Sequence, residues 1–424
     1  MQLFRIALYL INVILILYHI TQGISTDAQP YSYFVMLITD LYILWCSRKN
    51  MMLFLVAFVI SYSNYSIVFA NFIGQFSDTM YTNIISDEIT TISLNVLSLF
   101  NCLLLFLIPW HKVESTSTEN MFLDDDHYCK PVLLLLAICM VAVFFIGYNL
   151  PESEGLRGHP TPVYEYALSF FLVYFYFSGN NRSALAVGLF FVTIYALQNF
   201  IYGGRIYGLQ FILGAYIMVF MNHFSMKKTI LAIVFFFIFF SIIGTARGAL
   251  LSGNFDVQAI LYAIAANGFA LDTAYSAYYT SQTFVYVMEM LSDSTRLEYF
   301  SDFFLSIFFG ESANSSAKLI SVSRQFIHHN GGGVLPFFFY FYFGTIGIFI
   351  QALVLKIYLH LITKVNRDMN GLFKVVAAFI VAHSFRWYLY SPLGLFRGVL
   401  FLVIVYLGCS WIYNRILANK NRMM

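Results

Sequence analysis

The chain has 424 residues, of which 60% are hydrophobic and only 10% are charged. Soluble domains carry about 45–50% apolar and about 25% charged residues, so 23 basic and 21 acidic side chains cannot cover a soluble surface of this size. The 47 Phe and 31 Tyr suit a protein whose solvent is lipid, and a net charge of +2 gives no reason to expect a nucleic-acid partner.

The apolar residues form continuous runs, which predict helices rather than the alternating segments of a β-barrel. Residues 1–20 lack a basic leading region and a small-residue cleavage site, so the first run is predicted to be a retained span. The predicted spans are 3–21, 31–47, 51–70, 91–109, 131–148, 164–178, 184–201, 207–223, 229–246, 336–356, 372–388 and 394–414. The predicted fold is an all-α polytopic membrane protein with about twelve transmembrane helices, in a single integral-membrane domain over residues 1–424.

Basic residues in the loops set the orientation, because Lys and Arg concentrate on the cytoplasmic side. With the N-terminus inside, fifteen basic residues fall on the inner side and eight on the outer side. The inner set is Arg5, Arg48, Lys49, Lys112, Lys130, Arg182, Lys227, Lys228, Lys356, Lys364, Arg367, Lys374, Arg415, Lys420 and Arg422. Both termini are therefore predicted to be cytoplasmic.

Most loops are short, and the long exception is 247–335 on the predicted outer side. It is neither strongly polar nor low in complexity. Its stretches 259–270 and 303–309 are apolar enough to lie on the membrane surface as amphipathic helices. It ends in the glycine run 331–333, directly before the next predicted span.

The outer basic residues differ in type from the inner ones. Seven of the eight are Arg, whereas nine of the fifteen inner residues are Lys. The outer set is Arg157, Arg205, Arg247, Arg296, Lys318, Arg324, Arg386 and Arg397. The guanidinium fork binds phosphate or carboxylate through two parallel hydrogen bonds, so the excess of Arg indicates an anionic ligand. Salt bridges to outer carboxylates are the alternative explanation.

Four of these arginines lie next to the ends of predicted spans, at the depth of the outer headgroups. Arg205 follows two glycines in a tight turn, Arg247 closes the ninth span, Arg386 lies near the end of the eleventh and Arg157 lies between glycines. Ionisable groups at this depth are candidates for function, and snorkelling of the side chain to the interface is the alternative.

The segment from Arg324 to the glycine run contains two adjacent histidines, His328 and His329. Histidine is the usual general base near neutral pH. Adjacent rings seldom face one ion, so no metal site is predicted, and an ordinary surface pair is the alternative. Asp40 and His383 lie within predicted spans, where they form either a proton relay or a satisfied polar pair or helix–helix contact.

This architecture resembles the Wzy polymerases, bacterial integral-membrane glycosyltransferases that join repeat units of O-antigen or capsular polysaccharide. The resemblance rests on twelve spans with both termini inside, one dominant outer loop and the stretches 203–205, 245–248 and 328–336. Many members have two large outer loops, whereas this chain has one. The resemblance implies periplasmic chemistry at the bacterial inner membrane.

In that family, arginines engage a lipid-linked pyrophosphate, and a histidine assists the acceptor in the related ligases. The resemblance maps these roles onto Arg205, Arg247 and one of His328 or His329, with His329 favoured because it borders Asn330 and the glycines. The expected substrate-binding residues are Arg157, Arg324 and Arg386.

The implied reaction is an inverting polymerisation of undecaprenyl-pyrophosphate-linked glycans, without a metal or other cofactor. A chain-length regulator protein and membrane lipid are the expected partners. The alternatives are a lipid-linked oligosaccharide flippase and an O-antigen ligase. The concentration of polar chemistry outside the spans favours an enzyme over a transporter.

Overall fold

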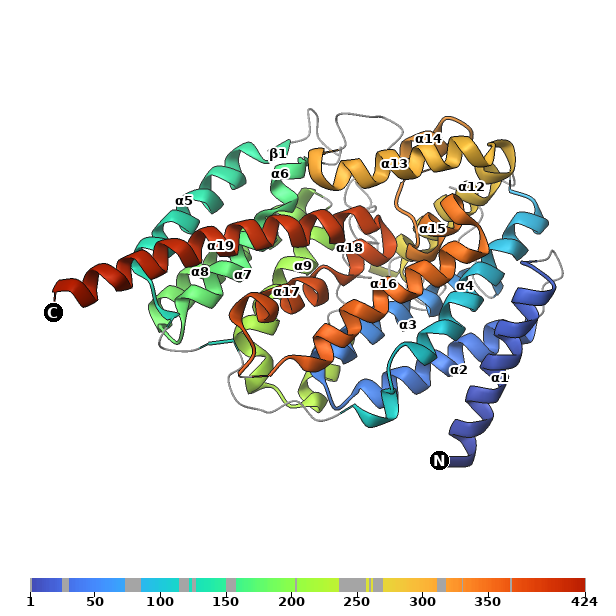
Figure 1. The fold of residues 1–424 in the computed structure, drawn as a ribbon, viewed down its shortest axis with the longest axis horizontal. Coiled ribbons are helices and arrows are strands. Elements are labelled where there is room, and N and C mark those ends of the chain that lie inside the picture. Colours follow the sequence, from blue (N-terminus) through green and yellow to red (C-terminus); the bar gives the residue numbers. More distant parts are fainter. Residues whose placement is uncertain are drawn as a thin grey trace. The chain divides into compact units, whose positions relative to one another are not determined.

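The computed structural model describes most of the chain, with gaps in several loops (Figure 1). The described residues are 2–24, 30–72, 85–113, 122–123, 127–149, 158–202, 204–235, 257–258, 261, 270–310, 318–329, 331–366 and 368–423. They are almost entirely helical; the two strands among them, β1 (Tyr148–Asn149) and β2 (His159–Pro160), pair antiparallel. The expected surface helix 259–270, apart from residues 261 and 270, lies outside the described residues.

Six helices are long and apolar enough to cross a membrane. They are Gln2–Thr21, Met51–Ala70, Asp87–Lys112, Arg182–Tyr202, Thr345–Lys364 and Pro392–Asn419. Shorter apolar helices cover Ser32–Ser47, Lys130–Ile146, Arg205–Phe220 and Gly371–Ala382. The chain is therefore an all-α membrane-embedded protein, as its composition predicts, and the total of twelve spans stays a prediction.

The contacts divide the chain into two compact units, and each unit gathers segments that are far apart in the sequence. The single integral-membrane domain over residues 1–424 stays a prediction. Unit 1 comprises Met1–Glu114, Val234–His360 and Arg386–Gly394, and unit 2 comprises Ser115–Ile233, Leu361–Phe385 and Leu395–Met424.

Unit 1 contains four N-terminal helices and most of the helices that follow residue 270. These are α1 (Gln2–Thr21), α2 (Pro30–Ser47), α3 (Met51–Phe72), α4 (Asp87–Leu107), α12 (Asp272–Met290), α13 (Asp293–Phe309), α14 (Leu319–Arg324), α15 (Leu335–Phe343) and most of α16 (Thr345–Lys364) and α18 (Ser384–Leu389). Helix α12 packs against α3, α4, α14 and α15. The expected outer loop thus supplies a helix to the interior of this unit.

Helix α13 includes the stretch 303–309, so the predicted helix is confirmed there. Phe303 and Ser306 are buried, whereas Phe304 and Phe308 are exposed. This division gives α13 one packed face, toward α15, and one apolar face that is open.

Unit 2 is built around α7, in which every residue except Phe170 is buried. Its elements are α5 (Lys130–Ile146), α6 (Pro162–Glu165), α7 (Ala167–Ser178), α8 (Arg182–Tyr202), α9 (Arg205–Ala215), the π-helical turn η4 (Tyr216–Phe220), η5 (Met221–His223), α17 (Gly371–Ala382) and most of α19 (Pro392–Met423). Tyr164, Phe171, Tyr195 and Phe211 form an aromatic cluster with ring centroids 5.0–6.0 Å apart.

Two spans predicted as continuous helices are divided. The span 336–356 breaks at Gly344, where φ of +61° separates α15 from α16; glycine adopts this conformation without the steric cost of a Cβ. The span 372–388 breaks at His383, which ends α17 and precedes α18.

Candidate functional site

The segment with the paired histidines lies in unit 1 between α14 and α15. His329 is buried, with 3% of its surface exposed, and its Nε2 lies 2.8 Å from Ser323 Oγ. Its Nδ1 accepts the Gly331 N–H at 3.1 Å and lies 3.3 Å from Thr280 Oγ1 on α12. Both ring nitrogens therefore have hydrogen-bond partners within the protein.

These bonds define the state of the His329 ring. Since Nδ1 accepts a backbone N–H, the proton of the neutral ring resides on Nε2 and is donated to Ser323 Oγ, which in turn donates to Ile320 O at 3.1 Å. Burial lowers the pKa of His329 to about 4, assisted by the positive charge of Arg324 and by His328. The ring is thus neutral near pH 7.

The glycines after His329 form a turn that only glycine accommodates. Gly331 and Gly332 have φ of +93° and +90°, in the region that L side chains rarely adopt. A Cβ on Gly332 would lie 2.9 Å from Leu389 O, and the Gly333 N–H donates to that carbonyl at 3.0 Å. The turn is therefore held against α18 as well as α12.

Arg324 and His328 lie on the same segment but are both exposed. The Arg324 Nη2 atom is 3.1 Å from the position that a Cβ on Gly331 would occupy, so its guanidinium lies over the glycine turn. Within the described part of the chain, His328 makes no side-chain hydrogen bond. The segment thus exposes the Arg324 guanidinium and the His328 imidazole, and the buried His329 holds the adjoining turn through its hydrogen bonds.

Arg386 is on α18, the short helix whose Leu389 carbonyl accepts from the glycine turn. Its guanidinium carbon lies 4.7 Å from the centroid of the Tyr390 ring, and the side chain is partly exposed. The glycine turn and the helix that carries Arg386 are therefore joined by a backbone hydrogen bond, although the sequence analysis treated them as separate candidates.

The remaining expected arginines are elsewhere. Arg205 begins α9 in unit 2, after Gly204, and is partly exposed. Two residues later, Tyr207 donates to Glu165 Oε1 at 2.6 Å. Arg157 and Arg247 lie outside the described residues.

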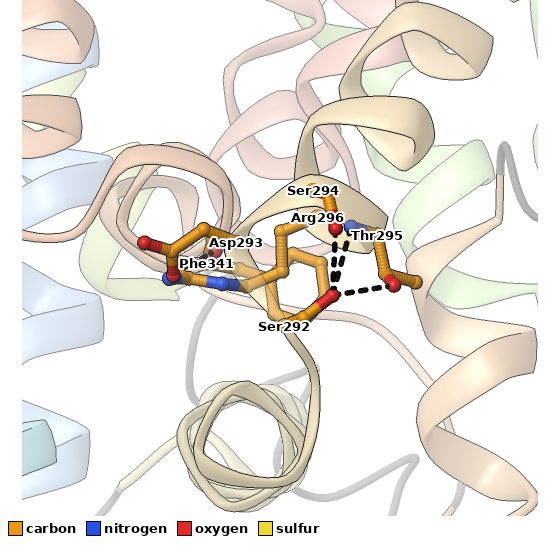
Figure 2. A network of polar contacts seen from close by, with 6 residues as sticks. All are labelled: Ser292, Asp293, Ser294, Thr295, Arg296 and Phe341. Carbon is orange, nitrogen blue, oxygen red and sulfur yellow. Dashed lines mark hydrogen bonds and ion pairs between the residues drawn. The ribbon is translucent and has the colours of Figure 1, made fainter.

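Arg296 follows the alternative explanation for the outer arginines, because it pairs with a carboxylate. Figure 2 shows its guanidinium between Asp293, with which it pairs, and Phe341 O, to which Nη1 donates at 3.1 Å. Ser292 caps the same helix by accepting the Thr295 N–H at 3.3 Å. Arg296 therefore fastens α13 to α15.

Asp40 and His383 each have a separate polar partner. In unit 1, Asn64 donates to Asp40 Oδ2 at 2.9 Å and accepts from Tyr388 at 2.8 Å. In unit 2, His383 Nδ1 lies 2.8 Å from Gln210 Oε1. These contacts agree with satisfied polar pairs between helices, the second of the two explanations.

Sequence reasoning missed Thr280 and Ser323, the partners that distinguish the two histidines. Neither has a sequence signal, because Thr280 is 49 positions away and Ser323 belongs to an ordinary helical turn. Among the described residues, no group of three or more His, Cys, Asp or Glu could hold a metal ion.

The fold and this segment define a membrane-embedded helical protein with an exposed basic turn. Comparisons with protein-family models, curated proteins and solved structures found no match for the chain.

Proposed function

We propose that this protein polymerises undecaprenyl-pyrophosphate-linked oligosaccharide repeat units into O-antigen or a related surface polysaccharide. The observation that carries the proposal is the exposed Arg324 and His328 on a turn fixed from within by His329. A guanidinium and an exposed imidazole on the same segment offer an anion-binding group and a base.

The proposed reaction needs a base for the acceptor hydroxyl and stabilisation of the leaving pyrophosphate. The acceptor hydroxyl attacks the anomeric carbon of the donor glycan, a base takes its proton, and the pyrophosphate lipid leaves with inversion of the anomeric centre. Fixed arginines stabilise the negative charge that develops on the leaving group, without a metal ion.

The two histidines take different roles in this proposal. The sequence favours His329 as the base, but its ring nitrogens are engaged and its pKa is lowered to about 4. The geometry favours His328, which is exposed, as the base, and His329 as the positioning residue of the turn. Arg205 and Arg247 serve the leaving pyrophosphate.

Arg157, Arg324 and Arg386 are proposed to bind substrate. The proposal includes twelve spans in the bacterial inner membrane, with both termini in the cytoplasm and the chemistry in the periplasm. A chain-length regulator protein is the proposed partner. No nucleic acid and no cofactor take part in the proposed reaction.

The test is the surface glycan of a strain in which the gene is deleted. A single repeat unit on the lipid core is the expected phenotype, because a polymerase acts after transport of the unit. Absence of any transferred unit would contradict the proposal and point to the flippase or the ligase. Complementation with the wild-type chain should restore the polymer ladder.

Two variants on the same exposed segment separate chemistry from folding. Loss of general-base catalysis costs about 10²–10⁴-fold in rate, so His328→Ala should leave single repeat units. Gln325→Ala, which is also exposed, is the matched control and should restore the ladder. A chelator should leave polymerisation by the purified protein intact; activity restored only by a divalent ion would contradict the proposed metal-independent reaction.

A further inference from the structure

A second cluster of basic side chains lines an open pocket in unit 1, at the end where α1 begins and α2 ends. The pocket has a volume of about 450 Å³, and its lining includes Arg5, Arg48, Lys49 and His111. Trp45 and Trp110 complete its walls. The proposed polymerase chemistry uses none of these residues.

Two of the basic side chains, Arg48 and Lys49, are carried by one tight turn. Between α2 and α3, the Asn50 N–H donates to Ser47 O at 2.9 Å, and the Asn50 side chain accepts the Leu53 N–H at 3.0 Å. These two cations are therefore held close together by the backbone, which lowers the entropic cost of binding an anion.

The opposite wall is fixed in a similar way. Trp110 Nε1–H donates to Leu104 O at 2.9 Å, which anchors the 3₁₀ turn η2 (Trp110–Lys112) to the end of α4. This turn packs against α2, and α1 packs against both α2 and α4. Arg5 and His111 thus face the same pocket from separate elements.

The charge in the pocket is of one sign. No carboxylate belongs to the described residues that line it. The Arg48 guanidinium carbon lies 3.6 Å from the centroid of the Trp45 ring, a cation–π contact that leaves the N–H edge of the fork available. Three basic side chains around an open volume attract an anion, and the fork geometry matches phosphate.

The surroundings of the pocket favour a lipid as the source of that phosphate. On α1, Leu3 is 82% exposed and Phe4 is 52% exposed, so apolar surface adjoins Arg5. Trp45 is half exposed, as tryptophans at the headgroup level of a bilayer are. A headgroup in the pocket would leave its acyl chains room along α1.

We infer that this pocket is a binding site for a phosphate-bearing anion, namely the headgroup of an anionic phospholipid at the predicted cytoplasmic face. Basic pockets between membrane helices recognise such headgroups through the same combination of charge and apolar surface. The inference does not depend on the proposed polymerase activity, since it concerns residues and a face that the reaction does not use.

The test is native mass spectrometry of the full chain in detergent, titrated with phosphatidylglycerol or with phosphatidylcholine. The wild type should retain phosphatidylglycerol in preference. Each basic residue near an anionic group contributes about fivefold in affinity, so Arg48→Gln/Lys49→Gln should weaken binding about 25-fold. Arg48→Lys, which keeps the charge but loses the fork, should bind more weakly than the wild type and more tightly than the double Gln variant.

The matched control is Lys227→Gln/Lys228→Gln, an exposed adjacent pair in unit 2 that should bind as the wild type does. Excess inorganic phosphate separates the two sources. If it fails to displace phosphatidylglycerol, the ligand is a lipid headgroup; if it displaces phosphatidylglycerol at matched ionic strength, the site takes free phosphate and the assignment to a lipid is overturned. Equal binding by pocket and control variants, or equal binding of phosphatidylcholine, would overturn the inference.

Discussion

His329→Ala tests whether the buried histidine holds the glycine turn in place. The substitution removes the bond to Ser323 Oγ and leaves the Gly331 N–H without its acceptor. An unmade bond to a buried polar group costs about 1–3 kcal/mol, so opening of the turn should become easier by about 2–3 kcal/mol. This corresponds to about 30- to 150-fold faster exchange of the amides that the turn protects.

The assay is hydrogen–deuterium exchange at Gly333 and Val334. Their N–H groups donate to Leu389 O at 3.0 Å and to Ser281 Oγ at 2.8 Å, so they report directly on the closed turn. His328→Ala is the control, because the exposed side chain has no bond to lose in the described part of the chain. His329→Asn, which restores an acceptor near the position of Nδ1, should recover part of the protection.

Measuring polymer synthesis in the same variants distinguishes the positioning role of His329 from the catalytic role proposed for His328. His328→Ala should lose polymer with unchanged exchange, whereas His329→Ala should lose polymer together with protection of the turn. Wild-type exchange in His329→Ala would refute the positioning role. Faster exchange in His328→Ala would refute the claim that this residue is structurally independent of the turn.

The other predictions use the same reasoning on other parts of the chain. Arg205→Lys should lose most of the polymer while the protein level holds, since Lys keeps the charge but not the fork; full-length polymer would show that position 205 only signals topology. A cysteine at position 205 should react with an impermeant maleimide in intact cells, and one at Lys49 should not; labelling at both would overturn the orientation. Arg296→Ala should speed exchange along α13 yet reduce polymer less than Arg205→Lys, because it removes a fastening to α15. The turn around His329 should be most stable above about pH 6.5 and weaken as the pH falls toward about 4, because the opened state takes up a proton that the closed state excludes; pH-dependent exchange, corrected for intrinsic rates and absent in His329→Asn, measures this.

The helices were predictable because lipid-exposed and core-facing side chains of a membrane protein are both apolar. Runs such as 3–21 and 51–70 therefore coincide with α1 and α3. The break at Gly344 was not predictable, since an isolated glycine in an apolar run is equally compatible with an unbroken helix. The positive φ there depends on the packing of α15 and α16 within the fold.

The candidate site was predictable only as a set of residue types. His328 and His329 are adjacent and chemically identical in the sequence, so periodicity gives no reason to bury one of them. The distinction comes from Thr280 and Ser323, whose hydroxyl groups lie near the ring nitrogens of His329 in the folded chain. Sequence reasoning therefore chose the residue next to the glycines, whereas solvent access favours its neighbour.

Helix α12 shows why mean hydropathy underestimates what a membrane protein can bury. Its 19 residues extend about 28 Å, and most of them are buried within unit 1. The sequence analysis placed this segment in the outer loop 247–335. Tyr278 donates to Thr90 O at 3.2 Å, and Gln282 donates to Thr90 Oγ1 at 3.0 Å, so these polar side chains are paired with α4. Pairing removes most of the cost of burying a polar group. A hydropathy scale counts each of these groups as if it were alone, and it therefore excludes the helix that carries the Thr280 contact to His329.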